Sequence, residues 1–139
     1  MSSKKKVVYQ LLAECIVYGL KGMDFVVSLP IDDIVKAYNG IGPSWFPEKL
    51  REAIDKLDPV LRPIALPHDC MFTYNDGSRE WFDKANNELE ENGLALADAK
   101  FAWYNPRRYL TRYRALTYAM LCRKYGWEAY TSDKMSKKA

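Results

Sequence analysis

The chain contains one histidine, His68, and an aspartate follows it directly in the sequence Pro67-His68-Asp69. A neutral imidazole can take a proton from water and so activate it as a nucleophile. A carboxylate suits hard cations such as Ca²⁺, which binds about six to eight oxygen ligands. Neighbouring residues on a helix point about 100° apart, so these two side chains would not bond each other but can border one cavity. The pair indicates metal-assisted hydrolysis, and the alternative is a histidine with a structural role.

A second candidate element lies upstream, in the segment Tyr38-Asn39-Gly40-Ile41-Gly42-Pro43. Two glycines and a proline in so short a run disfavour a helix or a central strand, so we expect a loop. Backbone carbonyls around Asn39–Gly42 would be free to point at a cation and to add to the Asp69 carboxylate. The alternative interpretation is a simple connection between two helices.

A third element follows the histidine, in the segment Trp81-Phe82-Asp83-Lys84-Ala85-Asn86-Asn87-Glu88-Leu89. Its apolar residues recur at helical spacing, and a polar group lies on the otherwise apolar face. Such a group, on a helix next to the histidine, would orient the imidazole ring. The acidic residues of the segment are also typical of a solvated helix face.

These candidate residues lie on segments whose apolar spacing is mostly helical. Apolar residues three and four positions apart, interrupted by Gly, Pro, Asn and Asp, predict one amphipathic helix after another. The expected helices cover approximately residues 7–16, 31–38, 50–57, 60–73 or 64–73, 79–92, 94–103 and 108–125. A short extended piece is expected at Phe25–Leu29. The fold class is therefore all-α or nearly so.

Glycine, proline and capping residues predict where the helices begin and end. Pro67 lies inside the helix that carries His68 and should kink it or delay its start. The other predicted boundaries are Gly19 or Gly22 after the first helix, the turn Tyr74-Asn75-Asp76-Gly77, the N-cap Ser78, the C-cap Asn92-Gly93, the break Asn105-Pro106 and the final Gly126.

Length and composition indicate one globular domain. The 139 residues are 48% hydrophobic and 28% charged, which is enough to build a core. We expect this domain at residues 7–130, between a flexible lysine-rich N-terminus at 1–6 and a flexible C-terminal tail at 131–139. The formal net charge of +3 is misleading, because six lysines and only one aspartate lie in these two ends. The body is slightly acidic, which excludes a broadly basic nucleic-acid-binding protein.

Cysteine usage and hydropathy narrow the class of protein further. Cys15, Cys70 and Cys122 match neither a disulfide framework nor a zinc cluster, so we expect a reducing compartment. No apolar run of about 18 or more residues predicts a transmembrane helix. Glu14 interrupts the apolar N-terminal stretch and no small-residue cleavage site follows, so secretion by a signal peptide is not expected.

The last predicted helix is strongly cationic. No acidic residue occurs between positions 107 and 125, and the cations there are Arg107, Arg108, Arg112, Arg114, Arg123 and Lys124. One interpretation is a solvated helix whose arginines pair with the acidic helix at residues 80–91. The other is a patch in which the first four arginines contact anionic phosphates, of lipid head groups or, as a weaker idea, of nucleic acid. No specific nucleic-acid partner is predicted.

Three segments taken together resemble the phospholipase A2 superfamily: Tyr38–Pro43, Ala65-Leu66-Pro67-His68-Asp69-Cys70-Met71-Phe72 and Phe82–Leu89. The similarity is greatest to the cysteine-poor phospholipase A2-like domains of viruses and bacteriophages. Those domains show a Tyr-x-Gly-x-Gly calcium loop, a His-Asp-x-x-Tyr helix and an Ala-Asp-x-x-Phe type helix. The resemblance spans residues 38–93 and implies a phospholipase A2-like helical core with additional N- and C-terminal helices.

The resemblance also implies a base and a calcium site. His68 matches the general base of the family, and Asp69 matches the carboxylate that holds calcium. The backbone carbonyls of Asn39, Gly40 and Gly42 match the ligands supplied by the calcium loop. A Ca²⁺ cofactor is therefore implied, and its role would be to polarise an ester carbonyl and stabilise the oxyanion.

The residue that orients the histidine differs from the family pattern. Asn86 stands where the family usually has an aspartate, and asparagine can still accept a hydrogen bond from the ring. Asp83, one turn earlier, is a second candidate for this role, since positions i and i+3 share a helix face. Phe72 stands where the family has a tyrosine hydroxyl.

The resemblance implies a calcium-dependent phospholipid ester hydrolase, encoded by a phage or virus and acting on a phospholipid or membrane surface. The alternative is a scaffold whose catalysis is impaired at Asn86 and Phe72 and which serves as a binding or virion-structural module. We expect the protein in the host cytoplasm or associated with the virion.

Overall fold

A computed structural model describes residues 2–38 and 59–131 of the chain. Within these ranges the fold is all-α, as predicted, and no strand is present. The helices are α1 (Ser3–Val17), α2 (Met23–Val27), α3 (Ile31–Ala37), the 3₁₀ helix η1 (Pro59–Leu61), α5 (Arg62–Thr73), α6 (Arg79–Lys100) and α7 (Pro106–Thr131). The expected helix at 50–57 and the glycine loop lie outside the described residues.

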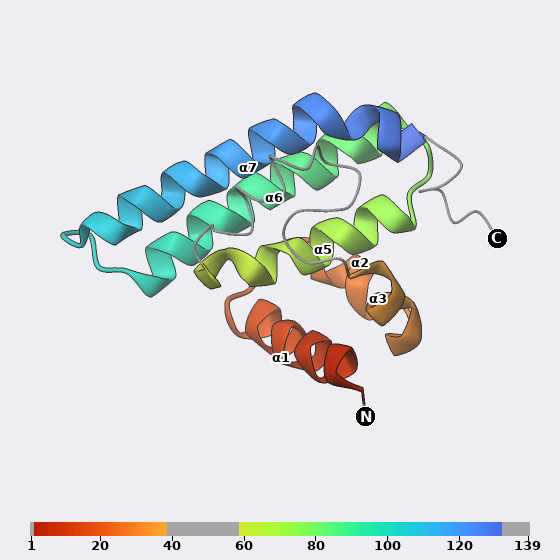
Figure 1. Ribbon diagram of the computed structural model, residues 1–139, viewed down its shortest axis with the longest axis horizontal. Coiled ribbons are helices and arrows are strands. Elements are labelled where there is room, and N and C mark those ends of the chain that lie inside the picture. The colour runs from red at the N-terminus through yellow and green to blue at the C-terminus, as the bar shows by residue number, and fades with distance from the viewer. Residues whose placement is uncertain (1, 39–58, 132–139) are drawn as a thin grey trace.

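The helices form layers on the two sides of α6. Helices α6 and α7 run antiparallel as a long pair, and α5 packs against α6 on the side away from most of α7 (Figure 1). Helices α1, α2 and α3 pack against the other side of α5. Helix α5 is therefore central, and every residue from Pro63 to Thr73 is buried.

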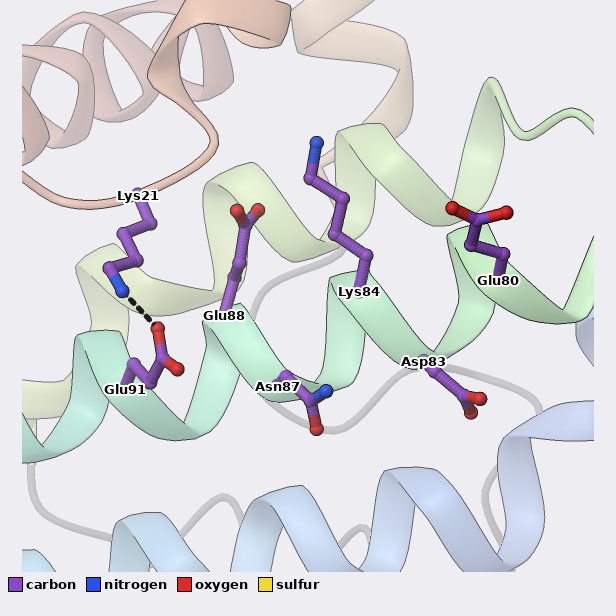
Figure 2. A pocket seen from close by; sticks show the side chains of 7 residues that line it. All are labelled: Lys21, Glu80, Asp83, Lys84, Asn87, Glu88 and Glu91. Carbon is purple, nitrogen blue, oxygen red and sulfur yellow. Dashed lines mark hydrogen bonds and ion pairs between the residues drawn. The ribbon is translucent and has the colours of Figure 1, made fainter.

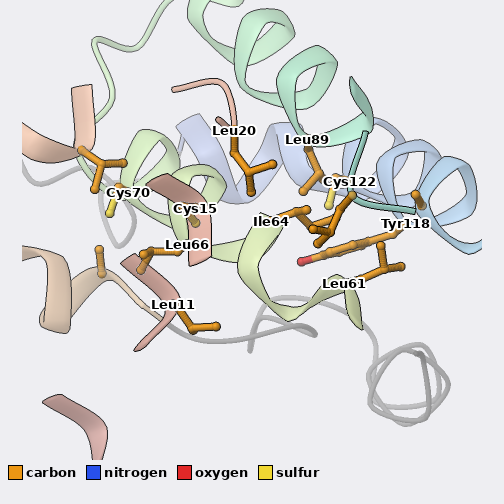
Figure 3. Close-up of a cluster of buried hydrophobic side chains, with 14 of the residues drawn as sticks. Leu11, Cys15, Leu20, Leu61, Ile64, Leu66, Cys70, Leu89, Tyr118 and Cys122 are labelled. Carbon is orange, nitrogen blue, oxygen red and sulfur yellow. The ribbon is translucent and has the colours of Figure 1, made fainter. Parts of the chain in front are cut away.

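A proline inside α5 explains how α1 is attached to it. The helix begins at Arg62, so Pro67 does not delay its start. Pro67 has no N–H, so the carbonyl of Pro63, four positions earlier, lacks its normal helical donor. The Cys15 thiol of α1 donates a hydrogen bond to this carbonyl, at an Sγ–O distance of 3.3 Å. Cys15 lies in the main core cluster, among leucines from α1 and α5 (Figure 3).

The turn before α6 agrees with the sequence prediction. Ser78 is the N-cap, and its Oγ accepts a hydrogen bond from the backbone N–H of Trp81 at 3.1 Å. Gly77 has a positive φ of 80°, a conformation that glycine adopts without strain. The Asn75 side chain accepts from the Gly77 N–H and donates to the Phe72 carbonyl, which closes the turn between α5 and α6.

The predicted C-cap at Asn92-Gly93 is wrong, because α6 continues to Lys100 and includes residues expected in a separate helix. The Asn92 side chain accepts from the Lys21 N–H and donates to the Lys21 carbonyl, so it ties the α1–α2 segment to α6. Gly93 allows close packing: a Cβ there would lie 2.5 Å from the Cβ of Ala115 on α7. The glycine marks a helix crossing rather than a helix end.

Three further sequence predictions are corrected by the structure. Phe25, Val26 and Val27, which were expected to be extended, belong to α2, and α7 passes through the buried Gly126 to Thr131. The lysines at 4–6, expected in a flexible end, belong to α1, which begins at Ser3 and is capped by the Ser2 hydroxyl, an acceptor of the Lys5 N–H.

Two of the sequence predictions concern membrane-spanning helices and disulfide bonds. None of the helices in residues 2–38 and 59–131 has the length and apolar character needed to cross a membrane. All three cysteines are free and buried, so they form no disulfide.

Candidate functional site

The sole histidine lies in the middle of α5 and faces α6. His68 is only 3% exposed, and its Nε2 atom lies 2.8 Å from Oδ1 of Asn86. The two residues are each nine positions from Gly77, on opposite sides of the turn. An antiparallel pair of helices joined by this turn places such positions at the same level, which is why the ring and the amide meet.

The contact determines which ring nitrogen carries the proton. An amide oxygen can only accept a hydrogen bond, so Nε2 of His68 is the donor and Nδ1 keeps a lone pair. Burial lowers the pKa of His68 from 6.5 to about 4, and the hydrogen bond to Asn86 opposes part of this effect. The imidazole is therefore neutral at physiological pH, as a general base must be.

The histidine ring is also held by an aromatic cluster. The Phe72 ring lies 4.2 Å from it, measured between centroids, and Phe72 in turn contacts Phe82 and Tyr130. Phe72 offers the ring an apolar contact without a hydroxyl. The apolar surroundings explain the strong desolvation of His68.

Asp69, the carboxylate predicted to bind metal, is 5% exposed and follows His68 on α5. Tyr38, the last described residue before the gap, lies close enough to feel its charge: burial raises the pKa of Tyr38, and the Asp69 carboxylate raises it further. Asn39, Gly40 and Gly42, the predicted carbonyl ligands, lie outside the described residues. No group of three or more His, Cys, Asp or Glu side chains in the described ranges is arranged to hold a metal ion.

The structure does not bring Asp83 to the histidine. Asp83 lies on the solvent side of α6, where its side chain is 53% exposed and its Oδ1 is 3.3 Å from Nε of Arg79. Asn86, three positions further along α6, is fully buried and is the partner of the ring. Of the two candidates for orienting the imidazole, the geometry favours Asn86.

Asn86 has one polar atom that finds no partner in the described part of the chain. Its Nδ2 is buried and makes no hydrogen bond. A buried amide donor without an acceptor costs about 1–3 kcal/mol. An aspartate at this position would bring no such donor.

Sequence reasoning missed a surface hollow on the other side of α6 (Figure 2). It has a volume of about 490 Å³, and its lining residues are Lys21, Glu80, Asp83, Lys84, Asn87, Glu88 and Glu91. Burial raises the pKa of Glu88, and Lys21 forms an ion pair with Glu91. The charged residues gave no signal beyond that of a solvated helix face, and neither His68 nor Asn86 lines the hollow.

The structure agrees in part with the interpretation that the arginines of α7 pair with acidic residues of α6. Arg108 and Arg112 both bind Asp98 of α6, at 2.9 and 2.6 Å, and Arg123 binds Glu90 of α6 at 2.8 Å. Three of the cations are thus engaged by α6 acids, although Asp98 lies beyond the acidic segment that was expected to pair with them.

Comparison of the chain with models of protein families, with curated protein sequences and with solved structures finds no match.

Proposed function

We propose that the chain is a calcium-dependent phospholipid ester hydrolase of the phospholipase A2-like type. The observation that supports it most is the 2.8 Å contact between His68 Nε2 and Asn86 Oδ1. It holds the only imidazole of the chain in a single tautomer, with Nδ1 as the basic atom, and Asp69 follows His68 on the same helix. These are the parts that a water-activating site requires.

In this proposal each described residue has a defined task. His68 Nδ1 takes a proton from the attacking water and later returns it to the leaving alcohol. Asn86 accepts the hydrogen bond from Nε2–H and so fixes both the orientation and the tautomer of the ring. Phe72 packs on the ring and excludes water from its face.

The Asp69 carboxylate is chemically suited to a calcium ion, since carboxylate oxygens are preferred calcium ligands. It is the one described residue of the implied ligand set, so the remaining oxygens would come from the predicted loop carbonyls. When bound, Ca²⁺ supplies a Lewis acid that polarises the ester carbonyl.

The second candidate is a scaffold with little or no catalysis that acts as a binding or virion-structural module. It is favoured by the neutral amide at Asn86, which cannot stabilise an imidazolium by charge as a carboxylate does. The burial of His68, with its pKa of about 4, points in the same direction, because protonation of such a ring is costly.

Fatty-acid release from mixed phospholipid vesicles tests the proposal. Wild type is measured with Ca²⁺ and with chelator, beside the His68→Ala variant. We expect calcium-dependent release that His68→Ala lacks. Wild-type release no greater than that of His68→Ala would exclude the hydrolase. In that case, calcium binding measured by calorimetry would favour the binding module.

A further inference from the structure

Helix α7 carries a stripe of large apolar side chains on its solvent face. Tyr109, Tyr113, Leu116 and Met120 are 43–67% exposed. Their spacing of four, three and four residues places them on one face of the helix, as at the a and d positions of a coiled coil. At the end of α6 and the turn that follows, Trp103 and Tyr104 are each 73% exposed and extend the apolar surface. We call Tyr109, Tyr113, Leu116 and Met120 the α7 stripe.

The opposite face of α7 explains why these side chains are not in the core. It packs on α6 through mostly small residues, including Thr111, Ala115, Ala119 and Cys122, all fully buried. The close approach at Gly93 and Ala115 leaves little room for large side chains there. Most of the large apolar residues of α7 therefore lie on the outside, which is the reverse of a normal surface helix.

Three of the six cations between positions 107 and 125 are bound to acids of α6. Arg108, Arg112 and Arg123 are drawn toward α6 by Asp98 and Glu90. The stripe is left as an uncharged, largely apolar seam, and monomeric proteins rarely expose contiguous apolar patches of this kind without a partner.

We propose that the α7 stripe is the interface of a homodimer, in which α7 packs antiparallel against α7 of a second copy. The spacing of the stripe is self-complementary in this arrangement. With the two-fold axis between positions 114 and 115, Tyr109 faces Met120 of the second copy and Tyr113 faces its Leu116. A two-fold axis repeats both contacts, as an isologous interface requires.

The same register separates the positive charges. Arg112 lies opposite Thr117 of the second copy. No cation of one α7 faces a cation of the other across the seam, so the cationic character of the helix does not oppose this pairing. In a parallel pairing, each cation would instead lie beside the same cation of the second copy.

The exposed area approaches that of a standard dimer interface. A fully covered aromatic side chain buries about 150–250 Å². Trp103, Tyr104, Tyr109 and Tyr113 are 54–73% exposed, so together they can bury on the order of 500 Å² per copy. Leucine and methionine of the stripe add to this, and a standard interface buries about 800 Å² per partner. The inference does not depend on the proposed hydrolase, because α6 lies between the stripe and His68 on α5 (Figure 1).

The mass of the full chain in solution tests the proposal. Light scattering behind size exclusion, from micromolar to sub-millimolar concentration, should give twice the chain mass of 16.1 kDa. Leu116→Glu places a charge in the seam and should give the monomer. Ile16→Glu, a matched change at an exposed apolar residue of α1, should leave the dimer intact. A monomeric wild type, or a dimer unchanged by Leu116→Glu, would overturn the proposal.

Cross-linking tests the antiparallel register. When Tyr109→Cys and Met120→Cys proteins are mixed and oxidised, the disulfide should form between the two different variants. The native cysteines are fully buried and should not compete. Preferential linkage of Tyr109→Cys to itself would show a parallel pairing and contradict the proposal. A monomer that sediments with anionic vesicles through Leu116 would assign the stripe to a lipid surface and would also overturn it.

Discussion

The proposed chemistry of the candidate site depends on the imidazole of His68 and the amide of Asn86. His68 is positioned by Asn86, so the ring has a partner, but that partner is neutral. A carboxylate in this place would stabilise the protonated ring by its charge, which an amide cannot do. The amide orients the imidazole, and its buried Nδ2 makes no hydrogen bond within the described residues.

The first prediction concerns the pKa of the histidine. Because the chain has a single histidine, its imidazole NMR signals are unambiguous. In wild type they should titrate with a pKa of about 4. Asn86→Asp places a negative charge beside the ring and should raise the pKa of His68 well above that of wild type. A wild-type pKa near 6.5 would contradict the buried position of the ring.

At the scale of elements, sequence periodicity predicted most helices but not their continuity. Helical spacing and the Ser78 cap identified the start of α6, because these signals are local. Asn92-Gly93 has the composition of a C-cap, yet its role is tertiary: Asn92 holds Lys21 and Gly93 admits Ala115. The segment that begins at Phe25 was expected to be extended, because it contains β-branched residues and precedes a proline. Its first three residues instead belong to the short helix α2, which packs against the core.

The same distinction separates the parts of the candidate site. The contact of His68 with a polar residue of the next helix was predictable from the order of the motifs. The choice of Asn86 over Asp83 was not, because it depends on the rotation of α6 about its axis. The packing of α5 and α7 on α6 determines that rotation, whereas the apolar pattern does not separate two positions that lie only about 60° apart on the helix.

The second prediction tests the close packing of α6 and α7. Gly93→Ala should destabilise the protein by about 1–3 kcal/mol through overpacking, although alanine is normally the better helix former. Ala115→Gly in the same chain removes the facing Cβ and should recover part of this loss. Urea denaturation of the two single variants and the double variant measures the coupling. Additive effects would show that the two positions do not touch.

The whole molecule should be sensitive to acid through its buried histidine. The unfolded chain binds a proton at His68 below pH 6.5, whereas the folded chain resists protonation until about pH 4. The unfolded state therefore holds more protons in this window, and the free energy of unfolding should fall as the pH is lowered. One pKa unit corresponds to about 1.4 kcal/mol, so the loss should be about 3 kcal/mol.

The matched control for this third prediction is His68→Gln, which can still donate a hydrogen bond to Asn86 but does not titrate. Other acid-sensitive groups, such as Glu88, contribute equally to both proteins. The difference between the two stability curves should therefore slope only between pH 6.5 and 4. Parallel curves would mean that burial does not shift the pKa of His68.

Fatty-acid release from phospholipid vesicles in the presence of Ca²⁺ tests whether His68 and Asn86 form a hydrolytic pair. Wild type, His68→Gln and Asn86→Asp are compared at equal concentration. We expect Asn86→Asp to release fatty acid at least about tenfold faster than wild type, because a carboxylate stabilises the imidazolium. We expect no release by His68→Gln. Equal rates for wild type and His68→Gln would contradict the proposed hydrolytic pair.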